Sequence, residues 1–558
     1  MTNSLKIALL QANPTVGDVA GNRDLVLKGL ARGEKDGADL IIFPELVTTG
    51  YPPEDLILKP AFREEAAEVL RELAKATKPG GPAALVGAPY KENGKIYNCL
   101  YLLGEGRILA RQKKFHLPNY GVFDEKRIFS EGPMPEVIPF RGLKLGVLVC
   151  EDMWYSDVPA HLAKAGADIL IAPHASPFED TKHDVRIGHA RARVLETSLP
   201  LVFVNQVGGQ DELVFDGASF VLNSKGETTT QLPAFEEAYS LVTFKKEATW
   251  QPEPGDITAL PEGDEQLYQA LMYGLREYVT KNRFPGVVIG LSGGIDSALT
   301  AALAVDALGP ERVETVMMPS PFTSDASLKD AQACAKALGV SHSSIDIAPM
   351  MASFEGELKE HFNECEADTT EENIQARIRG ILLMALSNKF GKMVLATGNK
   401  SEMSVGYSTL YGDLCGGFAI LKDVYKTKVY ALSRWRGENL PKGALGPKRD
   451  VIPENIFTKA PSAELKPGQT DQDTLPEYEV LDSILHAFVE GDKSVDDVVA
   501  MGHEPEVVAK IEHMLYVAEY KRRQAPPGVK ISRRLFGRDR RYPITNGFRD
   551  QPGREKGK

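Results

Sequence analysis

The chain is poor in cysteine, and its cysteines form no CxxC pair. Five of them are scattered over 558 residues, at Cys99, Cys150, Cys334, Cys365 and Cys415. An odd number at irregular spacing argues against a disulfide framework and against a structural zinc site. Such a set suits a reducing compartment, so we expect a cytoplasmic protein.

Long apolar runs are also missing. No stretch approaches the roughly 20 apolar residues that a membrane-spanning helix needs. The start, MTNSLKIALLQANP, lacks the basic end and the long apolar stretch of a secretion signal. We therefore expect no membrane partner. With 43% hydrophobic and 25% charged residues, the chain has the composition of a globular protein of about two to four domains.

The charge is negative overall but positive at the end of the chain. The formal net charge is -12, yet residues 520–558 hold thirteen Lys and Arg against three Asp and Glu. An acidic protein is a poor nucleic-acid binder by default. The basic end is either a nucleic-acid arm or a loop that meets anionic nucleotides. Its scarcity of aromatic residues for base stacking favours the second, so we expect no nucleic-acid partner.

Two series of alternating strands and helices predict two α/β domains. In the first, a hairpin at 96–111 argues against a purely parallel sheet. Residues 250–264 are rich in Pro, Gly and acid, which predicts a linker between a domain at 1–249 and a domain at 265–558. The second domain begins with predicted strands at 286–291, 313–318, 344–347 and 392–397, and 475–520 is predicted to be helical.

Three reactive side chains lie at or just beyond the ends of predicted strands. Glu45 ends DLIIFPE, Cys150 ends LKLGVLVC, and Lys114 follows the strand at 107–111. Singly, each has an ordinary structural interpretation, such as a buried thiol or a surface lysine. Together they form a nucleophile with a proton acceptor and a cation that stabilises negative charge. The acids that follow Cys150 oppose its ionisation unless they point away.

The segments around these residues resemble the nitrilase superfamily of carbon–nitrogen hydrolases. FPELVTTGYPPEDL, KKFHLPNYGVFDE and LVCEDMW occur in the family's order, and they are most similar to the glutaminase half of glutamine-dependent NAD synthetases. The resemblance implies an α-β-β-α sandwich that hydrolyses glutamine through a thioester. It implies Glu45 as general base, Lys114 rather than Lys113 as oxyanion stabiliser, and Cys150 as nucleophile. It also implies a second acid at Glu125 and a glutamine pocket lined by Tyr120, Ser176 and Lys182.

A second site is indicated by GLSGGIDS, between a predicted strand and a predicted helix. Glycines let backbone N–H groups close around an anion at the start of a helix. The loop lacks the lysine of GxxxxGK[ST], so it is not the common P-loop. Asp296 is expected to face the phosphates, and a carboxylate in that place indicates Mg²⁺ between them.

This loop resembles the pyrophosphate loop of adenylate-forming ligases, and longer strings such as ATGNKSEMSVGYSTLYGD and KAPSAELKPGQTDQD resemble NAD synthetase. The resemblance implies a doubly wound parallel sheet with a helical, basic end. The implied ligase consumes glutamine, ATP and deamido-NAD, with Mg²⁺ as the cofactor of ATP. The ATP-binding residues are expected to be Gly290, Leu291, Ser292, Gly293, Gly294, Ile295, Asp296, Ser297 and Thr397. Those for deamido-NAD are Asn373, Glu402, Lys426 and Lys521, and the metal ligands are Asp296 and Glu402.

Some alternatives stay open at this point. Arg377 is either a phosphate ligand or a solvated helix residue. The same loop also fits an amidotransferase that acts on a different acceptor. A binding protein with inactive sites and an amidase with an inert second domain are further possibilities. The family further implies a homo-oligomer, a dimer or larger. The fusion of the two activities argues for ammonia channelling, because ammonia that escapes is protonated at neutral pH.

Overall fold

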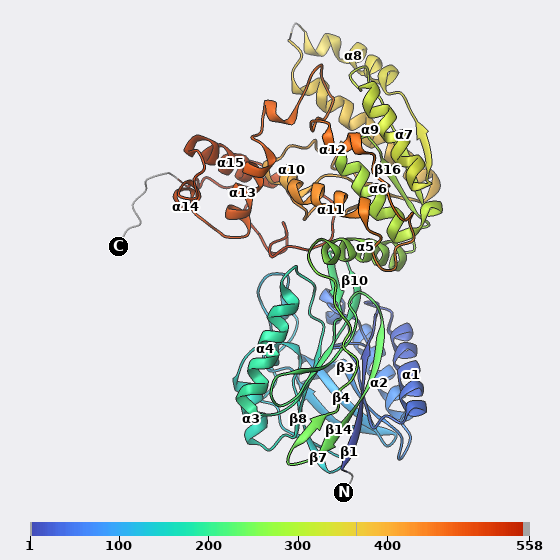
Figure 1. Cartoon of the computed structure of the whole chain (residues 1–558), viewed down its shortest axis with the longest axis vertical. Coiled ribbons are helices and arrows are strands. Elements are labelled where there is room, and N and C mark those ends of the chain that lie inside the picture. The colour runs from blue at the N-terminus through green and yellow to red at the C-terminus, as the bar shows by residue number, and fades with distance from the viewer. Residues whose placement is uncertain (1–2, 364, 551–558) are drawn as a thin grey trace. The chain divides into compact units, whose positions relative to one another are not determined.

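The computed structural model describes residues 3–363 and 365–550, and the chain divides into two compact units (Figure 1). The first ends at Pro261 and the second begins at Glu262. This boundary lies inside the predicted linker at 250–264. Both ends of that segment belong to regular elements. Trp250–Pro252 form strand β15, which pairs with β14, and helix α5 (Gly263–Lys281) begins near the other end. Trp250 is buried in the core of the first unit, which explains why the chain is still ordered there.

Two mixed sheets form the centre of the first unit. The larger has the order β15-β14-β1-β2-β3-β4-β5 and the smaller has the order β13-β12-β9-β8-β7-β6. Only β1, β2 and β3 in one sheet, and β7, β8 and β9 in the other, pair in parallel. The strands of the larger sheet are β1 Ser4–Gln11, β2 Leu40–Ile42, β3 Ala83–Glu92, β4 Lys95–Gly104, β5 Arg107–Lys113 and β14 Ala238–Lys246. Those of the smaller are β6 Ile138–Phe140, β7 Leu143–Val147, β8 Ile169–His174, β9 Leu201–Asn205, β12 Phe220–Leu222 and β13 Thr228–Gln231.

Side chains alternate in direction along the strands. Those on one face form an inner core between the two sheets, and those on the other face form outer cores under the helices. On β1, Ile7 and Leu9 face the other sheet, whereas Ala8 faces the helices, as period-two side chains require. Helices α1 (Val19–Asp36) and α2 (Pro60–Ala76) cover the larger sheet, and α3 (Asp157–Lys164) and α4 (Lys182–Thr197) cover the smaller. The α-β-β-α sandwich is therefore confirmed. A separate hairpin, β10 (Val207–Gln210) and β11 (Leu213–Asp216), follows β9.

The second unit has one five-stranded parallel sheet in the order β18-β17-β16-β19-β20. The first strand of the unit, β16, lies in the middle, so the strand order reverses between β16 and β19. Ligands bind outside the carboxyl ends of the strands at such a reversal. The doubly wound sheet is confirmed. Its strands are β16 Val287–Gly290, β17 Val313–Met317, β18 Ser341–Ser344, β19 Met393–Ala396 and β20 Phe418–Ala419.

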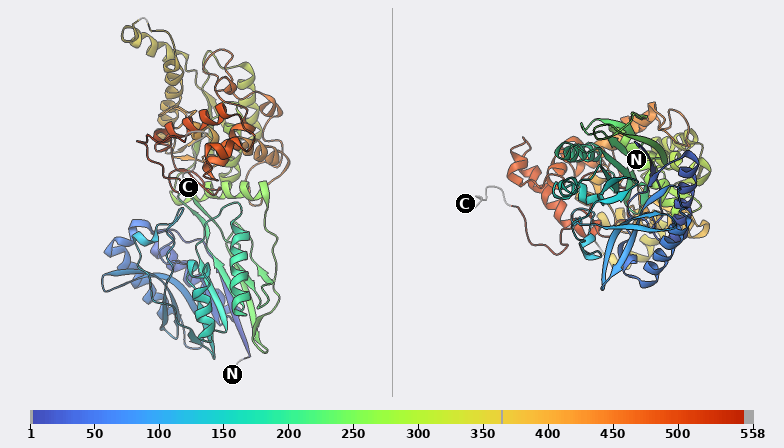
Figure 2. Two further views of the ribbon diagram at one scale, coloured as in Figure 1. Left: turned by 90° about the vertical axis from the view of Figure 1, so that its left-hand side faces the viewer. Right: turned by 90° about the horizontal axis from the view of Figure 1, so that it is seen from below.

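One predicted strand, 344–347, is wrong by three residues. The strand is β18, Ser341–Ser344, a polar segment at the edge of the sheet. The apolar residues that suggested a strand, Ile345 and Ile347, pack instead into the core under the long helix α9 (Thr369–Phe390). An edge strand needs few apolar residues because one of its sides faces solvent. Helix α8 (Ala348–Phe362) follows at once and projects from its unit (Figure 2).

Helices surround this sheet and continue to the end of the described chain. Near the sheet lie α6 Ile295–Leu308, α7 Asp325–Leu338, α10 Lys400–Val405, α11 Lys426–Glu438 and α12 Glu454–Thr458. The predicted helical end is confirmed as α13 Tyr478–Val489, α14 Val495–Val499, α15 Pro505–Val517 and α16 Glu519–Arg522. The first three of these helices share one apolar core. In the described residues no helix is both long and apolar enough to cross a bilayer.

Candidate active sites

The three reactive residues of the first unit come together between its two sheets. Glu45 follows β2, Lys114 follows β5, and Cys150 opens a short 3-10 turn just beyond β7. The Lys114 ammonium lies 2.7 Å from the Glu45 carboxylate. All three side chains are buried. Lys113, the alternative lysine, pairs instead with Glu92, near the surface.

The Glu45 carboxylate is held on both of its oxygens. Asn98 donates from its side-chain amide to Oε1 at 2.7 Å, and the backbone N–H of Ala175 donates to Oε2 at 3.2 Å. Neither partner stands out in the sequence, because Asn98 lies on a strand and Ala175 acts through its backbone. These contacts fix the carboxylate in one orientation, as a general base requires.

A second carboxylate, Glu125, completes this cluster. Its Oε1 accepts from Lys114 Nζ at 2.9 Å and from the Tyr51 hydroxyl at 2.8 Å. Burial raises the pKa of Glu125 to about 7 despite the opposing lysine. Burial also acts to lower the pKa of Lys114, but the charges of Glu125 and Glu45 outweigh it and hold that pKa well above its ordinary value. Lys114 therefore stays a cation.

Cys150 sits in an unusual backbone conformation and rests as a thiol. Its φ is +47°, a region that non-glycine residues seldom occupy and that is found at functional sites. Burial raises the pKa of the thiol well above its ordinary value of 9.0; the charge of Glu45 adds to this, and the charge of Lys114 opposes it. The sulfur can therefore act as a nucleophile only when a base removes its proton during the reaction.

The acids after Cys150 have their own partners. Asp152 accepts backbone N–H groups from Val149, Phe115 and His116 at 2.8–3.1 Å, which ties the cysteine turn to the loop after Lys114. Glu151 accepts from the Tyr120 hydroxyl at 3.1 Å. Burial raises the pKa of Asp152 to about 6 and also raises that of Glu151. The charge of Glu151 still acts to raise the pKa of the Cys150 thiol.

The residues predicted for a glutamine pocket lie near this turn but in different surroundings. Tyr120 is half exposed and binds Glu151. Lys182 begins α4, and its ammonium lies 4.7 Å from the centre of the Trp154 ring and close enough to Glu151 to lower the pKa of that acid. Ser176 is buried and bonds to Arg186. Glu151 and Trp154, which contact Tyr120 and Lys182, were not singled out from the sequence, although both belong to the LVCEDMW motif.

A cavity of about 290 Å³ lies at the carboxyl ends of β16 and β19 in the second unit. The glycine-rich loop forms one wall and leads into α6. Gly293 has a φ of +78°, and a Cβ there would come within 2.4 Å of the Ser327 carbonyl oxygen, so only glycine fits. Most of the predicted ATP-binding residues line the cavity: Gly290, Leu291, Ser292, Gly294, Ile295, Asp296, Ser297 and Thr397. Gly293 supplies the turn behind it.

The charged centre of this cavity is a lysine between two carboxylates. Lys426 Nζ contacts Asp296 and lies 3.2 Å from Glu402. Asn399 donates to Asp296 at 2.8 Å and caps the helix that carries Glu402. Burial raises the pKa of Glu402 to about 8, with Lys426 opposing and Asp296 adding to the shift. Two carboxylates beside a phosphate loop are a donor set that fits Mg²⁺.

The other residues predicted for the dinucleotide support a loop and do not line this cavity. Asn373 accepts from the Thr409 hydroxyl, and Lys521 donates to the carbonyls of Gly406 and Ser408. Arg377 is exposed and donates to the Leu410 carbonyl. The cavity is lined instead by two cations that we had not singled out. They are Arg379, which donates to the Met318 carbonyl, and Lys459, which donates to the Gly293 carbonyl.

Comparison with known proteins gives the same division of the chain. The carbon–nitrogen hydrolase family matches residues 6–250, and the NAD synthase family matches residues 267–525. A glutamine-dependent NAD(+) synthetase of Rhodobacter capsulatus is 49% identical over 99% of this chain and 100% of the relative. The chain belongs to the family of glutamine-dependent NAD(+) synthetases.

Solved structures of glutamine-dependent NAD(+) synthetases agree with this assignment. The enzyme of Acinetobacter baumannii in complex with ADP is 42% identical, with a TM-score of 0.78 over 98% of this chain and 100% of that one. The Cytophaga hutchinsonii enzyme, at 21% identity, has the same fold with a TM-score of 0.83 over 98% of both chains.

The raised pKa of Cys150 predicts how its reactivity depends on pH. Because the group is neutral below its folded-state pKa, the thiolate fraction rises with pH and does not level off near pH 9. In the absence of glutamine, alkylation of Cys150 by iodoacetamide should therefore accelerate steadily from pH 7 past pH 9. Mass spectrometry of the Cys150 peptide measures the rate, with exposed Cys365 as the internal reference. A plateau below pH 8 would contradict a resting thiol.

Proposed function

We propose that this chain makes NAD from deamido-NAD, ATP and glutamine, with the two half-reactions assigned to the two sites described above. The observation that supports this most directly is that each unit carries a complete set of reactive groups. The first has a nucleophile, a base and a cation in one buried cluster. The second has a cavity of about 290 Å³ lined by a glycine loop and two carboxylates.

In the first half-reaction, Cys150 attacks the side-chain amide carbon of glutamine. Glu45 accepts the thiol proton and delivers it to the departing nitrogen, so that ammonia leaves and a thioester remains. Lys114 stabilises the negative oxygen of the tetrahedral intermediate. Water, deprotonated by Glu45, then attacks the thioester carbonyl and releases glutamate, and the proton returns to the sulfur.

Recognition of glutamine is assigned to the charged groups near the Cys150 turn. Glu151 suits the α-ammonium group, and Lys182 suits the α-carboxylate, because the two side chains carry opposite charge and lie near each other. Tyr120 holds Glu151 in place through its hydroxyl. Ser176 supplies a hydroxyl at the end of β8. This arrangement distinguishes glutamine from simple amides, which lack both charges.

In the second half-reaction, the carboxylate of deamido-NAD attacks the α-phosphorus of ATP and pyrophosphate leaves. Ammonia then attacks the acyl carbon of the adenylate, and AMP leaves as NAD forms. The loop at 290–297 and Thr397 hold ATP, while Lys426 neutralises charge that develops on the phosphates. Asp296 and Glu402 would hold Mg²⁺, which neutralises phosphate charge when bound. Among the described residues no group of three or more His, Cys, Asp or Glu is placed to hold a metal, so these two carboxylates are the only protein ligands that we propose.

Another acceptor for the same loop is the main alternative. The glycine-rich loop by itself indicates that an adenylate forms, but it does not identify the carboxylate that receives AMP. The match to the NAD synthase family over 267–525 favours deamido-NAD. A pyrophosphate-release assay with deamido-NAD against other carboxylates decides between them. A homo-oligomer, which the family implies, and a cytoplasmic location, which the scattered cysteines suggest, stay predictions.

Replacing the nucleophile separates the two half-reactions. In Cys150→Ala, glutamine-driven NAD formation should fall by at least about 10³-fold, because the thioester cannot form. NAD formation with an ammonium salt should stay near the level of the unmodified protein. Cys99→Ala, which removes another buried thiol of the same unit, serves as the control and should change neither rate. Equal loss with both nitrogen sources would overturn the assignment.

Replacing Asp296 tests the second site. Asp296→Asn removes a charge from the proposed metal site and from the contact with Lys426, so synthesis should drop by about 10²-fold or more with either nitrogen source. Glutamine hydrolysis should continue, at a reduced or altered rate. Asp325→Asn, at the exposed start of α7, is the matched control. Normal synthesis by Asp296→Asn over a range of Mg²⁺ concentrations would exclude its role.

Channelling of ammonia within the protein is tested by isotope competition. Free ammonia is mostly ammonium at neutral pH and is then not nucleophilic, which favours direct transfer. With glutamine labelled by ¹⁵N in its amide and an excess of unlabelled ammonium in the medium, the nicotinamide group of the product should carry mainly ¹⁵N. The isotope ratio is read by mass spectrometry. Dilution of the label to the ratio in the medium would rule out direct transfer.

A further inference from the structure

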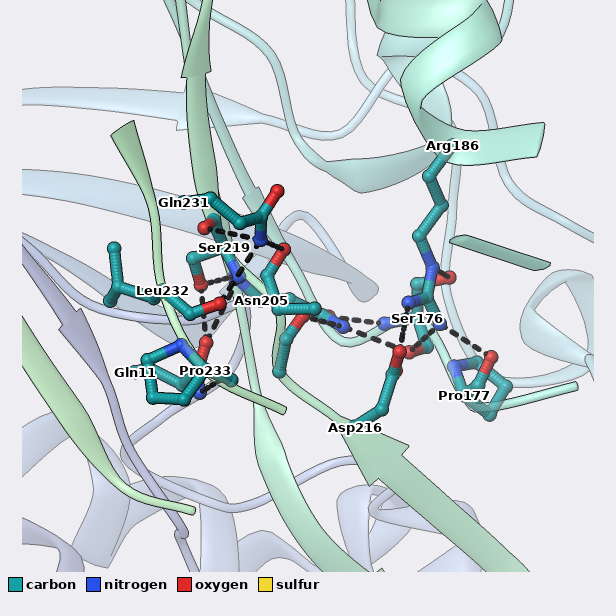
Figure 3. Close-up of polar contacts among 12 residues, drawn as sticks. Gln11, Ser176, Pro177, Arg186, Asn205, Asp216, Ser219, Gln231, Leu232 and Pro233 are labelled. Carbon is teal, nitrogen blue, oxygen red and sulfur yellow. Dashed lines mark hydrogen bonds and ion pairs between the residues drawn. The ribbon is translucent and has the colours of Figure 1, made fainter. Parts of the chain in front are cut away.

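Arg186 on α4 is a fully buried arginine that the mechanism above does not use. Its guanidinium makes five hydrogen bonds, one from Nε and two each from Nη1 and Nη2 (Figure 3). Three of them go to the segment after β8: to Ser176 Oγ at 3.0 Å, to the Ser176 carbonyl at 2.8 Å and to the Pro177 carbonyl at 2.7 Å. Arg186 therefore holds Ser176 through both the hydroxyl and the backbone carbonyl of the serine.

Asp216, the last residue of β11, fixes the other side of the guanidinium. Both of its carboxylate oxygens accept from Arg186 Nη1, at 2.7 and 2.8 Å, and Asp216 is itself buried. The Arg186 charge is thus neutralised within the protein. Because the two charges are paired with each other, we assign the pair no direct role in binding substrate.

The contact with Arg186 determines the direction of the hydrogen bonds of Ser176. A guanidinium has donors only, so Ser176 Oγ must accept from Arg186 Nε. The hydroxyl proton of Ser176 then has to point elsewhere, and the described residues offer it no acceptor. Buried hydroxyls are normally hydrogen-bonded, so we expect this proton to be accepted by a bound water or by an oxygen or nitrogen atom of a ligand.

The backbone of Ser176 is locked as well. Its N–H donates to Asn205 Oδ1 at 2.9 Å, and its carbonyl accepts from Asn205 Nδ2 at 3.1 Å. Asn205 is tied in turn to Ser219, whose hydroxyl donates to Gln11 (Figure 3). One residue before Ser176, Ala175 donates its N–H to Glu45. The hydroxyl is thus held in a rigid frame that also touches the general base.

We propose that Arg186, locked by Asp216, is a positioning residue that makes Ser176 a hydrogen-bond donor to an oxygen of bound glutamine. The inference rests on the proposed glutaminase function of this unit. It gives the Arg186–Asp216 pair a role in the affinity for glutamine, although neither residue contacts glutamine. An alternative role, in which the pair only joins α4 to the β10–β11 hairpin, makes different predictions for kinetics.

Arg186→Lys is the variant that tests this role. Lysine keeps the positive charge but cannot occupy Ser176 Oγ, both carbonyls and Asp216 at once. We expect the KM for glutamine to rise roughly 10- to 100-fold, the cost of a misplaced polar contact, with a much smaller change in kcat. Inactivation by 6-diazo-5-oxonorleucine, a glutamine analogue, should slow by a similar factor. Alkylation of Cys150 by iodoacetamide and ammonium-driven NAD synthesis should stay unchanged.

Arg193→Lys is the matched control on the same helix. Arg193 is also buried, but it binds the Trp154 carbonyl and Glu196 and does not contact Ser176. It should leave the KM for glutamine within about twofold, as expected away from the contact. In a Ser176→Ala background, Arg186→Lys should have little further effect on KM, because the two residues act through one contact.

Several results would overturn the proposal. An unchanged KM in Arg186→Lys would do so, as would equal losses of glutamine-driven and ammonium-driven synthesis, since these indicate a purely structural role. Should Arg186→Lys not fold, Ser176→Ala alone decides, because it removes the hydroxyl and spares the ion pair: an unchanged KM overturns the proposal and a raised KM supports it. Failure of the proposed function itself is recognised separately, by an unmodified protein that does not hydrolyse glutamine.

Discussion

Buried lysines that each bridge two carboxylates dominate the electrostatics of this protein. Lys114 lies between Glu45 and Glu125 in the first unit, and Lys426 lies between Asp296 and Glu402 in the second. One ammonium cannot balance two ionised acids, and uncompensated charge is costly away from water. Each cluster therefore needs either a proton or a second cation. Burial accordingly raises the pKa of Glu125 to about 7 and that of Glu402 to about 8.

The same imbalance serves a different purpose in each unit. In the glutaminase cluster the reaction moves a proton from sulfur to nitrogen, so a site that already holds a titrating acid beside a fixed ammonium is suited to it. In the synthetase cavity the substrates bring phosphate charge. There the excess carboxylate charge suits a divalent cation, which Asp296 and Glu402 would hold and which would supply positive charge beside the phosphates. Each active site thus combines a lysine that stays cationic with a carboxyl group whose charge can change.

Much of this could be predicted from sequence, for physical reasons that also mark the limits. Glu45 and Cys150 ended clear apolar runs, and strand ends bring reactive groups together. The glycine loop was recognisable because only glycine fits at Gly293. Contacts between distant segments were not recognisable: Arg186 meets Asp216 thirty residues later, and Asn98 meets Glu45 across two strands. The polar edge strand β18 lacked an apolar pattern. Asn373 and Lys521 contact the loop at 406–409, and their role in binding the dinucleotide stays a prediction.

The basic end of the chain has a role that its charge alone does not suggest. Arg522 and Arg540 both pair with Glu519, and Lys530 pairs with Asp539, all inside the second unit. A third buried lysine, Lys400 on α10, contacts Asp423 and Glu490 and donates to Ser532 and to the Arg534 carbonyl. Asp423 also accepts from the backbone of 531–532. Because α10 carries Glu402 and begins after Asn399, the end of the chain holds in place the helix that forms the charged centre of the synthetase site.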